Sequence, residues 1–278
     1  MAIVIGASRS WREIVNNIQR WGHTIASPGD IERLLLDLRE TREASIAAKR
    51  AETDLAVQQK AQQITALKSE RRLIQRILNW FRVGALQSAI AGLHAAEAEY
   101  TRILDDKILM VESLRDSPEL AGANGELTVI EQLRRLPGAY VVMNNVQLHA
   151  TSHIRFNGAL LRSAQIDHLV LSPAGVFIIE TKNWSARFTQ SGQYDNPYEQ
   201  VRRAGHLCYC LLRKSFGKTR VRTIIVSLGN LPPSPEDSYA KVLRPEQING
   251  YISWFKEVEL SPERIDALRR YFEVCVQG

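Results

Sequence analysis

Apolar residues divide the chain into three zones that differ in periodicity. In the first zone, residues 1–26, they recur at the spacing of one helix face: Trp11, Ile14, Val15, Ile18 and Trp21. Two tryptophans on one face are typical of a helix that packs against a neighbour. This zone is therefore predicted to be a short amphipathic helix. Ser27-Pro28-Gly29-Asp30 then supplies a capping serine, a proline and an acid at the positions that begin a new helix.

The second zone, residues 27–117, has no proline after Pro28 and is rich in Ala, Glu, Arg, Gln and Leu, which predicts long helices. Its apolar residues fit a coiled-coil spacing in part. Two arrangements explain this pattern: an antiparallel helical hairpin that turns near Val83-Gly84, and a parallel dimeric coiled coil. Either would serve for homo-oligomerisation or for docking a protein partner.

Basic and aromatic residues gather near the proposed turn. They are Lys68, Arg71, Arg72, Trp80, Phe81, Arg76 and Arg82. Such a cluster fits a contact with nucleic acid, a membrane surface or a partner. It also fits a solvated basic face on which two aromatic residues fix the turn.

The third zone, residues 118–278, changes to alternating helices and strands after the linker Asp116-Ser117-Pro118. We predict in order a helix 124–136, an extended run 140–148, a polar loop, a strand 165–171, a turn 172–175, a strand 176–182, a helix capped by Asn196, a strand 222–228, and helices 245–256 and 262–274. The fold class is thus α/β (α+β), with a mixed sheet flanked by helices and preceded by an all-α hairpin or coiled coil.

Composition narrows the classes of partner and compartment. The 278 residues carry a net charge of +6, which favours acidic partners such as nucleic acid. Three cysteines are too few for a disulfide framework, so a cytoplasmic location is expected. The chain start lacks a signal-peptide pattern. The most apolar stretch, 73–93, is interrupted by polar and charged residues, so no transmembrane segment is expected.

Two acids and a lysine are predicted to meet at one end of the two central strands. Because strand side chains alternate, Glu180 and Lys182 share a face, and a tight turn brings Asp167 beside Glu180. Oxygen ligands from Asp167 and Glu180, with the Thr181 carbonyl, suit Mg²⁺ or Mn²⁺. Such an ion activates water and polarises a phosphate, while Lys182 steadies the developing charge. An acid thirteen positions before Glu-x-Lys also occurs by chance in many proteins.

Four sequence blocks add weight to this interpretation. They are Gly122-Ala123-Asn124-Gly125-Glu126, Gln165-Ile166-Asp167-His168, Ile179-Glu180-Thr181-Lys182-Asn183 and Asn196-Pro197-Tyr198-Glu199-Gln200. In order and spacing they resemble the nuclease-related domain, a branch of the PD-(D/E)xK nuclease superfamily, over residues 120–244. The resemblance implies a metal-dependent nuclease core. Members often have a glycine after the third block, where this chain has Trp184-Ser185-Ala186-Arg187.

The resemblance also implies roles for individual residues. Asp167 and Glu180 would be metal ligands, Lys182 the catalytic lysine, Gln200 an active-site amide and Glu126 a helix carboxylate. Glu126 equally fits an acid favoured by the helix dipole. A bacterial setting, with a role in DNA processing or anti-phage defence, is the biological expectation that comes with the family.

A stretch without acids follows Gln200 and supplies candidate phosphate contacts. Its candidates are Arg202, Arg203, Arg213, Lys214 and Lys218, with Arg220 and Arg222 beyond them. A solvated basic helix face is the alternative. His168 is expected on the opposite face from Asp167, in a structural role, and His206 on the surface.

The leading hypothesis is a Mg²⁺-dependent nuclease that acts on DNA. A catalytically silent protein that uses a nuclease fold for nucleic-acid binding or scaffolding is the alternative, and an RNA substrate is a third.

Overall fold

The computed structural model describes residues 1–69, 73–236 and 238–277, with the backbone alone at residues 73 and 74. It divides into two units, one formed by Met1–Thr24 with Ser117–Gly278 and the other by Ile25–Asp116.

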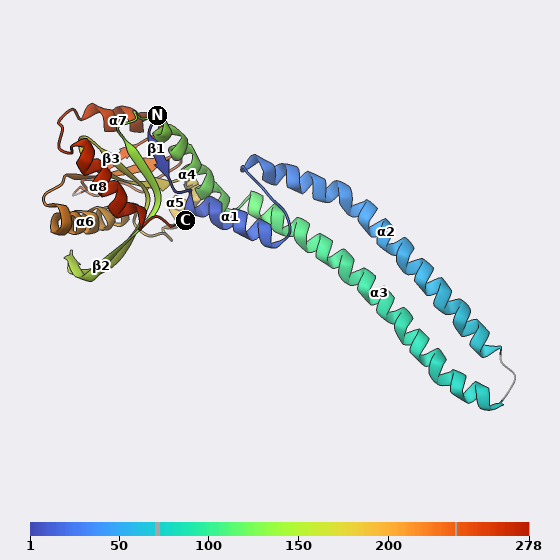
Figure 1. Ribbon diagram of the computed structural model, residues 1–278. Coiled ribbons are helices and arrows are strands. Elements are labelled where there is room, and N and C mark those ends of the chain that lie inside the picture. Colours follow the sequence, from blue (N-terminus) through green and yellow to red (C-terminus); the bar gives the residue numbers. More distant parts are fainter. Residues whose placement is uncertain (70–72, 237, 278) are drawn as a thin grey trace. The chain divides into compact units, whose positions relative to one another are not determined.

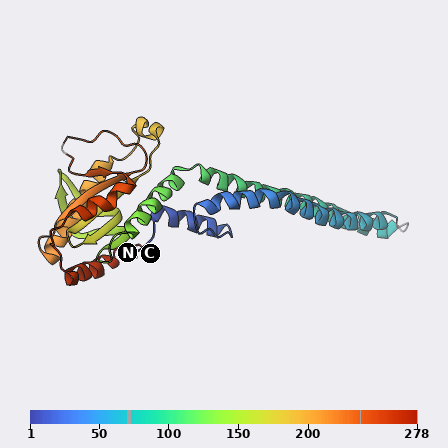
Figure 2. The ribbon, with the colours of Figure 1, turned by 90° about the horizontal axis from the view of Figure 1, so that it is seen from above.

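The helical unit is an antiparallel hairpin. Helix α2 (Gly29–Lys68) and helix α3 (Leu73–Arg115) run side by side in both views (Figures 1 and 2). Ion pairs link the helices in antiparallel order: Arg39 with Glu112 at 2.5 Å, Arg42 with Asp105 at 2.6 Å, and Arg50 with Glu97 at 3.2 Å. The single chain therefore forms the predicted hairpin by itself.

The predicted position of the turn is wrong, because α2 ends at Lys68 and α3 continues through Gly84. Glycine inside a helix costs only about 1 kcal/mol, which packing along the rest of the helix offsets. The Asn79 side chain donates a 2.9 Å hydrogen bond to the Leu67 carbonyl. This bond satisfies one of the carbonyls left open in the last turn of α2.

The basic and aromatic cluster near the turn is described only in part. Arg71 and Arg72 lie outside the described residues. Trp80 and Phe81 are 71% and 67% exposed and pack edge to face, with ring centres 5.0 Å apart. These two rings therefore do not fix the turn by packing into the hairpin.

The N-terminal segment packs with the sheet unit. A short strand β1 (Ile3–Ile5), which the sequence analysis missed, pairs with β2. Helix α1 (Arg9–Arg20) begins at Ser8, whose side chain accepts a hydrogen bond from the Trp11 amide. It buries Trp11, Ile14 and Ile18 and contacts helix α4 (Pro118–Arg134). The apolar stripe is thus the docking face that the sequence predicted.

The sheet is mixed, as predicted, and has the strand order β1-β2-β3-β4-β5-β6. Its other strands are β2 (Val141–Phe156), β3 (Ala159–Ser172), β4 (Gly175–Lys182), β5 (Val221–Ser227) and β6 (Lys241–Leu243). The pairs β2-β3 and β3-β4 are antiparallel, whereas β1-β2, β4-β5 and β5-β6 are parallel.

Helices cover both faces of this sheet and give it two apolar cores. The remaining helices are α5 (Ala186–Ser191), α6 (Pro197–Phe216), the 3₁₀ turn η1 (Pro245–Gln247), α7 (Ile248–Trp254) and α8 (Pro262–Glu273). One core contains apolar residues of α6 and α8, and the other contains those of α4 and α7. The sheet side chains alternate between the two cores, which fixes the face on which each polar residue at a strand end emerges.

Two predicted boundaries need correction. The polar loop expected between residues 148 and 165 is instead an antiparallel arm of β2 and β3, closed by Asn157-Gly158. Both residues have positive φ, 47° and 78°, which suits a two-residue hairpin turn. Helix α4 begins at Pro118 rather than near Asn124, because the Ser117 side chain accepts a hydrogen bond from the Leu120 amide.

The three cysteines are free thiols, and Cys208 is buried in the core beneath α6. In the part of the chain that the structure describes, no helix combines the length and the apolar character needed to cross a membrane.

Candidate active site

The strands β3 and β4 bring the two predicted acids together. Their antiparallel register pairs His168 with Ile179. Asp167, one residue before His168, therefore lies level with Glu180, one residue after Ile179. The Asp167 carboxylate also accepts a 2.8 Å hydrogen bond from the Thr181 amide. This bond fixes Asp167 against the end of β4.

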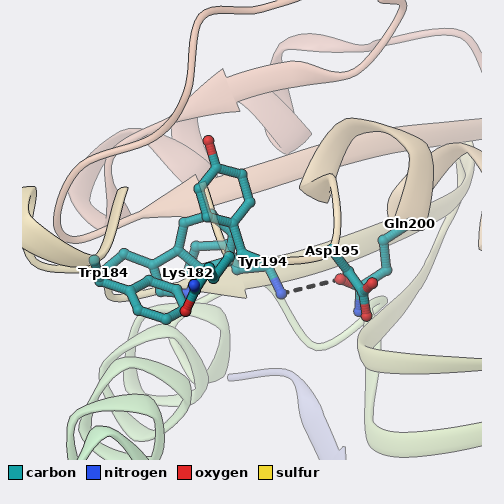
Figure 3. A pocket seen from close by; sticks show the side chains of 7 residues that line it. Lys182, Trp184, Tyr194, Asp195 and Gln200 are labelled. Carbon is teal, nitrogen blue, oxygen red and sulfur yellow. Dashed lines mark hydrogen bonds between the residues drawn. The ribbon is translucent and has the colours of Figure 1, made fainter. Parts of the chain in front are cut away.

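Lys182 links the strand to helix α6. Its Nζ donates to Glu180 Oε1 at 2.6 Å. It also donates to Gln200 Oε1 at 3.1 Å (Figure 3). Gln200 lies in the first turn of α6, where the Asn196 side chain accepts hydrogen bonds from the amides of Tyr198 and Glu199. The capped helix start therefore holds Gln200 against the lysine.

Glu126 approaches the acids from helix α4. It is buried, and its Oε1 accepts a 2.6 Å hydrogen bond from the Ser10 hydroxyl. Neighbouring Gly125 permits this approach, since a Cβ there would lie 3.1 Å from Asn183 Cβ and 3.3 Å from Thr181 Cγ2. The structure thus brings together all five residues that the sequence proposed as catalytic.

The cluster combines carboxylates that repel one another with one lysine that attracts them. Burial raises the pKa of Asp167 well above its usual value, and the charges of Glu180 and Glu126 raise it further. Burial likewise raises the pKa of Glu180. Burial alone would lower the pKa of Lys182, but its attraction to Glu180 and Asp167 outweighs this and raises that pKa. Lys182 is therefore held as a cation.

The donor set suits a hard divalent cation. Among the described residues, no three His, Cys, Asp or Glu side chains converge so that they could hold an ion by themselves. Asp167, Glu180 and the Thr181 carbonyl offer oxygen ligands, and Mg²⁺ commonly takes only one or two protein carboxylates with water or phosphate. A dication would also offset the repulsion between the buried carboxylates, so the residues fit such an ion.

His168 lies on the other side of the strand, as the alternation predicted. It is fully buried, with Nδ1 2.8 Å from Asn144 Oδ1 and Nε2 3.1 Å from Thr181 Oγ1. The amide nitrogen of Asn144 donates to backbone carbonyls, so its oxygen is free to accept from Nδ1–H and the Thr181 hydroxyl donates to Nε2. Burial lowers the pKa of His168 to about 3, which keeps the ring neutral.

The candidate phosphate-binding residues are spread along α6. Arg202 and Arg203 lie less than one turn beyond Gln200, and Arg203 lines a cavity of about 310 Å³ that Gln200 also lines. Arg213 and Lys214 lie in the last turn, about 20 Å along the helix from Gln200 at 1.5 Å per residue, and Lys218 follows the helix end. The first pair therefore lies close to Gln200 along the helix, and the other three residues do not.

Three other residues noted in the sequence have structural partners. Arg220 pairs with Glu257 and Glu259. The Arg222 guanidinium lies 4.0 Å from the centre of the Phe255 ring. His206 Nε2 lies 3.0 Å from the Arg155 carbonyl oxygen, at the surface.

A cavity of about 700 Å³ beside Lys182 was missed by the sequence analysis. Its lining consists of Lys182, Trp184, Phe188, Gln193, Tyr194, Asp195 and Gln200 (Figure 3). Most of these residues lie in or beside α5, in the segment where the resemblance lacks its usual glycine. The signal in the sequence was the presence of three aromatic residues close together, Trp184, Phe188 and Tyr194.

Comparison with known proteins supports the resemblance over part of the chain. Residues 121–228 match the family model described as the nuclease-related domain. An uncharacterized protein of Bacillus anthracis is 33% identical over 98 residues, which cover 30% of this chain and 42% of that protein. The chain therefore spans less than half the length of that relative.

A structural likeness adds no further information. The crystal structure of protein VC1899 from Vibrio cholerae matches 91% of this chain and 59% of its own, at 13% identity and a TM-score of 0.26. Similarity at that level does not establish a shared fold.

Proposed function

We propose that this protein is a divalent-metal-dependent nuclease, on the premise that residues 121–228 form a nuclease-related domain. The observation that carries the proposal is the buried cluster of Asp167, Glu180 and Glu126 around the cation of Lys182. Buried groups of like charge with strongly shifted pKa values are typical of functional sites.

Each side chain of the cluster has a distinct task in this proposal. Asp167, Glu180 and the Thr181 carbonyl would hold Mg²⁺ or Mn²⁺, which supplies activation of water and charge neutralisation at the phosphate. Lys182, held as a cation, stabilises negative charge on the phosphate oxygens and does not act as a base. Gln200 holds the Lys182 ammonium in place through its side-chain oxygen.

The proposal is tested by cleavage of labelled DNA and RNA, single- and double-stranded, with Mg²⁺, Mn²⁺ or chelator. Lys182→Ala is expected to reduce the cleavage rate by roughly 100-fold or more, as loss of one charge-stabilising group commonly does. Lys256→Ala is the matched control, since Lys256 is an exposed lysine of the same unit. Equal cleavage by the wild type and Lys182→Ala would refute the assignment.

The proposal includes DNA as the substrate, a cytoplasmic location and a role in DNA processing or anti-phage defence. The helical unit would serve oligomerisation or partner docking. Retained DNA binding without any metal dependence, and with unchanged affinity in Asp167→Ala, would favour the catalytically silent alternative.

A further inference from the structure

An aromatic cavity adjoins the site lysine, and the carboxylate cluster does not account for it. The Trp184 ring centre lies 5.3 Å from that of Phe188 and 4.8 Å from that of Tyr194, and the last two are 6.0 Å apart. Lys182 Nζ lies 5.4 Å from the Trp184 ring centre. The aromatic rings therefore lie directly beside the lysine at which the phosphate is proposed to bind.

We propose that this cavity binds one unpaired nucleobase of the substrate, stacked on Trp184 and Tyr194, beside the phosphate that lies at Lys182. The inference rests on the proposed nuclease function and deepens it. It assigns the substrate class as single-stranded or locally unpaired nucleic acid.

The rings line a cavity and are not part of a core. Neither apolar cluster of the sheet, as described, includes Trp184, Phe188 or Tyr194. Trp184 and Tyr194 are partly exposed, and Phe188 is 37% exposed. The cavity of about 700 Å³ lies within the range of small-ligand sites. Exposed aromatic faces beside a cation are the surface on which single-stranded nucleic acids stack their bases.

The backbone holds Trp184 in place before any ligand arrives. The Trp184 carbonyl accepts a 2.9 Å hydrogen bond from the Asn230 amide, and the Leu228 amide donates to the Lys182 carbonyl at 3.0 Å. Gly229 allows the close approach, because a Cβ there would lie 2.2 Å from the Trp184 carbonyl oxygen. The segment after β4 is thus tied to the end of β5, which fixes the main chain that carries the ring.

The cavity lining carries charges of both signs. Lys182 is the only basic side chain among its described lining residues, and Asp195 contributes a carboxylate. A phosphate is therefore favoured at Lys182 and disfavoured near Asp195. A neutral, flat base with hydrogen-bonding edges suits the remainder, where the oxygens of Asp195 and Gln193 can accept from exocyclic amino groups.

Pairing in a duplex makes the base unavailable to this cavity. A base in a duplex is stacked on its neighbours, and its extrusion costs free energy that a single strand or a mismatch does not require. We therefore expect the protein to bind and cleave single strands, or strands with unpaired positions, in preference to perfect duplex.

Binding of labelled single strands to the full-length protein in chelator, followed by fluorescence anisotropy, tests the inference without cleavage. Two strands of about 12 nucleotides are compared, one with bases and one abasic throughout. Trp184→Ala is expected to weaken binding of the base-bearing strand by about 5- to 150-fold, the loss of one stacked base. Binding of the abasic strand should stay unchanged.

Two further variants separate stacking from folding. Trp184→Phe keeps an aromatic face and should retain most of the affinity, which a variant with a disrupted fold would not. Trp254→Ala is the matched control, because Trp254 is a 72% exposed tryptophan of the same unit. It should leave both affinities unchanged.

The inference is overturned if Trp184→Ala weakens both strands equally, if Trp254→Ala has the same effect, or if no single strand binds. Its failure differs from that of the proposed function. Base-dependent binding without metal-dependent cleavage would refute hydrolysis and leave the cavity assignment standing. Cleavage of single strands and duplexes alike, with no Trp184 effect, would refute the cavity assignment alone.

Discussion

Helix α6 lies close to strand β5 at Gly205, so a substitution that adds one methyl group there tests how the helix is placed. A Cβ at Gly205 would lie 2.5 Å from Thr223 Cγ2, whereas 3.4–4 Å is ordinary contact. Gly205 lies in the same helix as Gln200, and the Lys182–Gln200 hydrogen bond of 3.1 Å depends on where that helix sits. Gly205→Ala should therefore affect both stability and activity.

The expected magnitude is a balance of two effects. Alanine is favoured over glycine inside a helix by about 1 kcal/mol. Against this, an extra methyl in a close-packed contact costs about 1–3 kcal/mol, because the helix or the strand must move. Gly205→Ala should thus lower the free energy of unfolding by about 0–2 kcal/mol. Displacement of Gln200 by up to 1 Å should slow cleavage by up to about 100-fold.

Urea denaturation and initial cleavage rates measure the two effects. Gly250→Ala is the matched control, since Gly250 lies in α7 of the same unit with no atom within 4 Å of an added Cβ. It should stabilise the protein by about 0.5–1 kcal/mol. In a Thr223→Ala background the clash is absent, so Gly205→Ala should behave like the control. A Gly205→Ala protein that is stabilised as much as Gly250→Ala in the wild-type background would refute the close contact.

Three further predictions concern pH, structure and metal. Burial lowers the pKa of His168 in the folded protein to about 3, whereas the pKa of histidine in the unfolded chain is about 6.5. Between these two pH values the unfolded state therefore binds one more proton than the folded state. On acidification through this window, the unfolding free energy of the wild type should fall relative to that of His168→Asn by up to about 1.4 kcal/mol per pH unit. Equal pH slopes of the two proteins in a denaturation series would contradict this prediction. Arg222→Leu removes a 2.6 Å hydrogen bond to the Ala174 carbonyl and should cost about 1–3 kcal/mol in urea denaturation, with unchanged binding of nucleic acid. Mg²⁺ at 100 times its dissociation constant should add about 2.7 kcal/mol of stability in thermal unfolding, and an equal gain in Asp167→Ala would argue against Asp167 as a ligand.

The sequence predicts the sheet and the acid pair well because both depend on short-range rules. Alternation along strands and a four-residue turn place Asp167 level with Glu180, and the register of β3 and β4 follows from them. The Asn196 cap and the proline after it likewise fix the start of α6 within one residue. Local patterns of this kind need no knowledge of distant contacts.

Features that depend on distant contacts escaped prediction. Strand β1 is three residues long and exists because it pairs with β2, more than 130 residues away. The end of α2 at Lys68 is stabilised by the Asn79 side chain, which donates to a carbonyl of the opposite helix, whereas Gly84 offered the more obvious break. Ser10 reaches Glu126 across 116 positions in the sequence. Periodicity carries no signal for any of these.

The acid cluster itself favours a ligand-binding role over a purely structural one. A structural ion pair matches one carboxylate to one cation, but here burial raises the pKa of both Asp167 and Glu180 while Lys182 supplies a single positive charge. Carboxylates buried with like charges weaken the fold at neutral pH unless a bound cation offsets them. Asp167 is nevertheless fixed by the Thr181 amide and not directed to solvent. This arrangement is what the proposed metal-dependent function requires of its carboxylates.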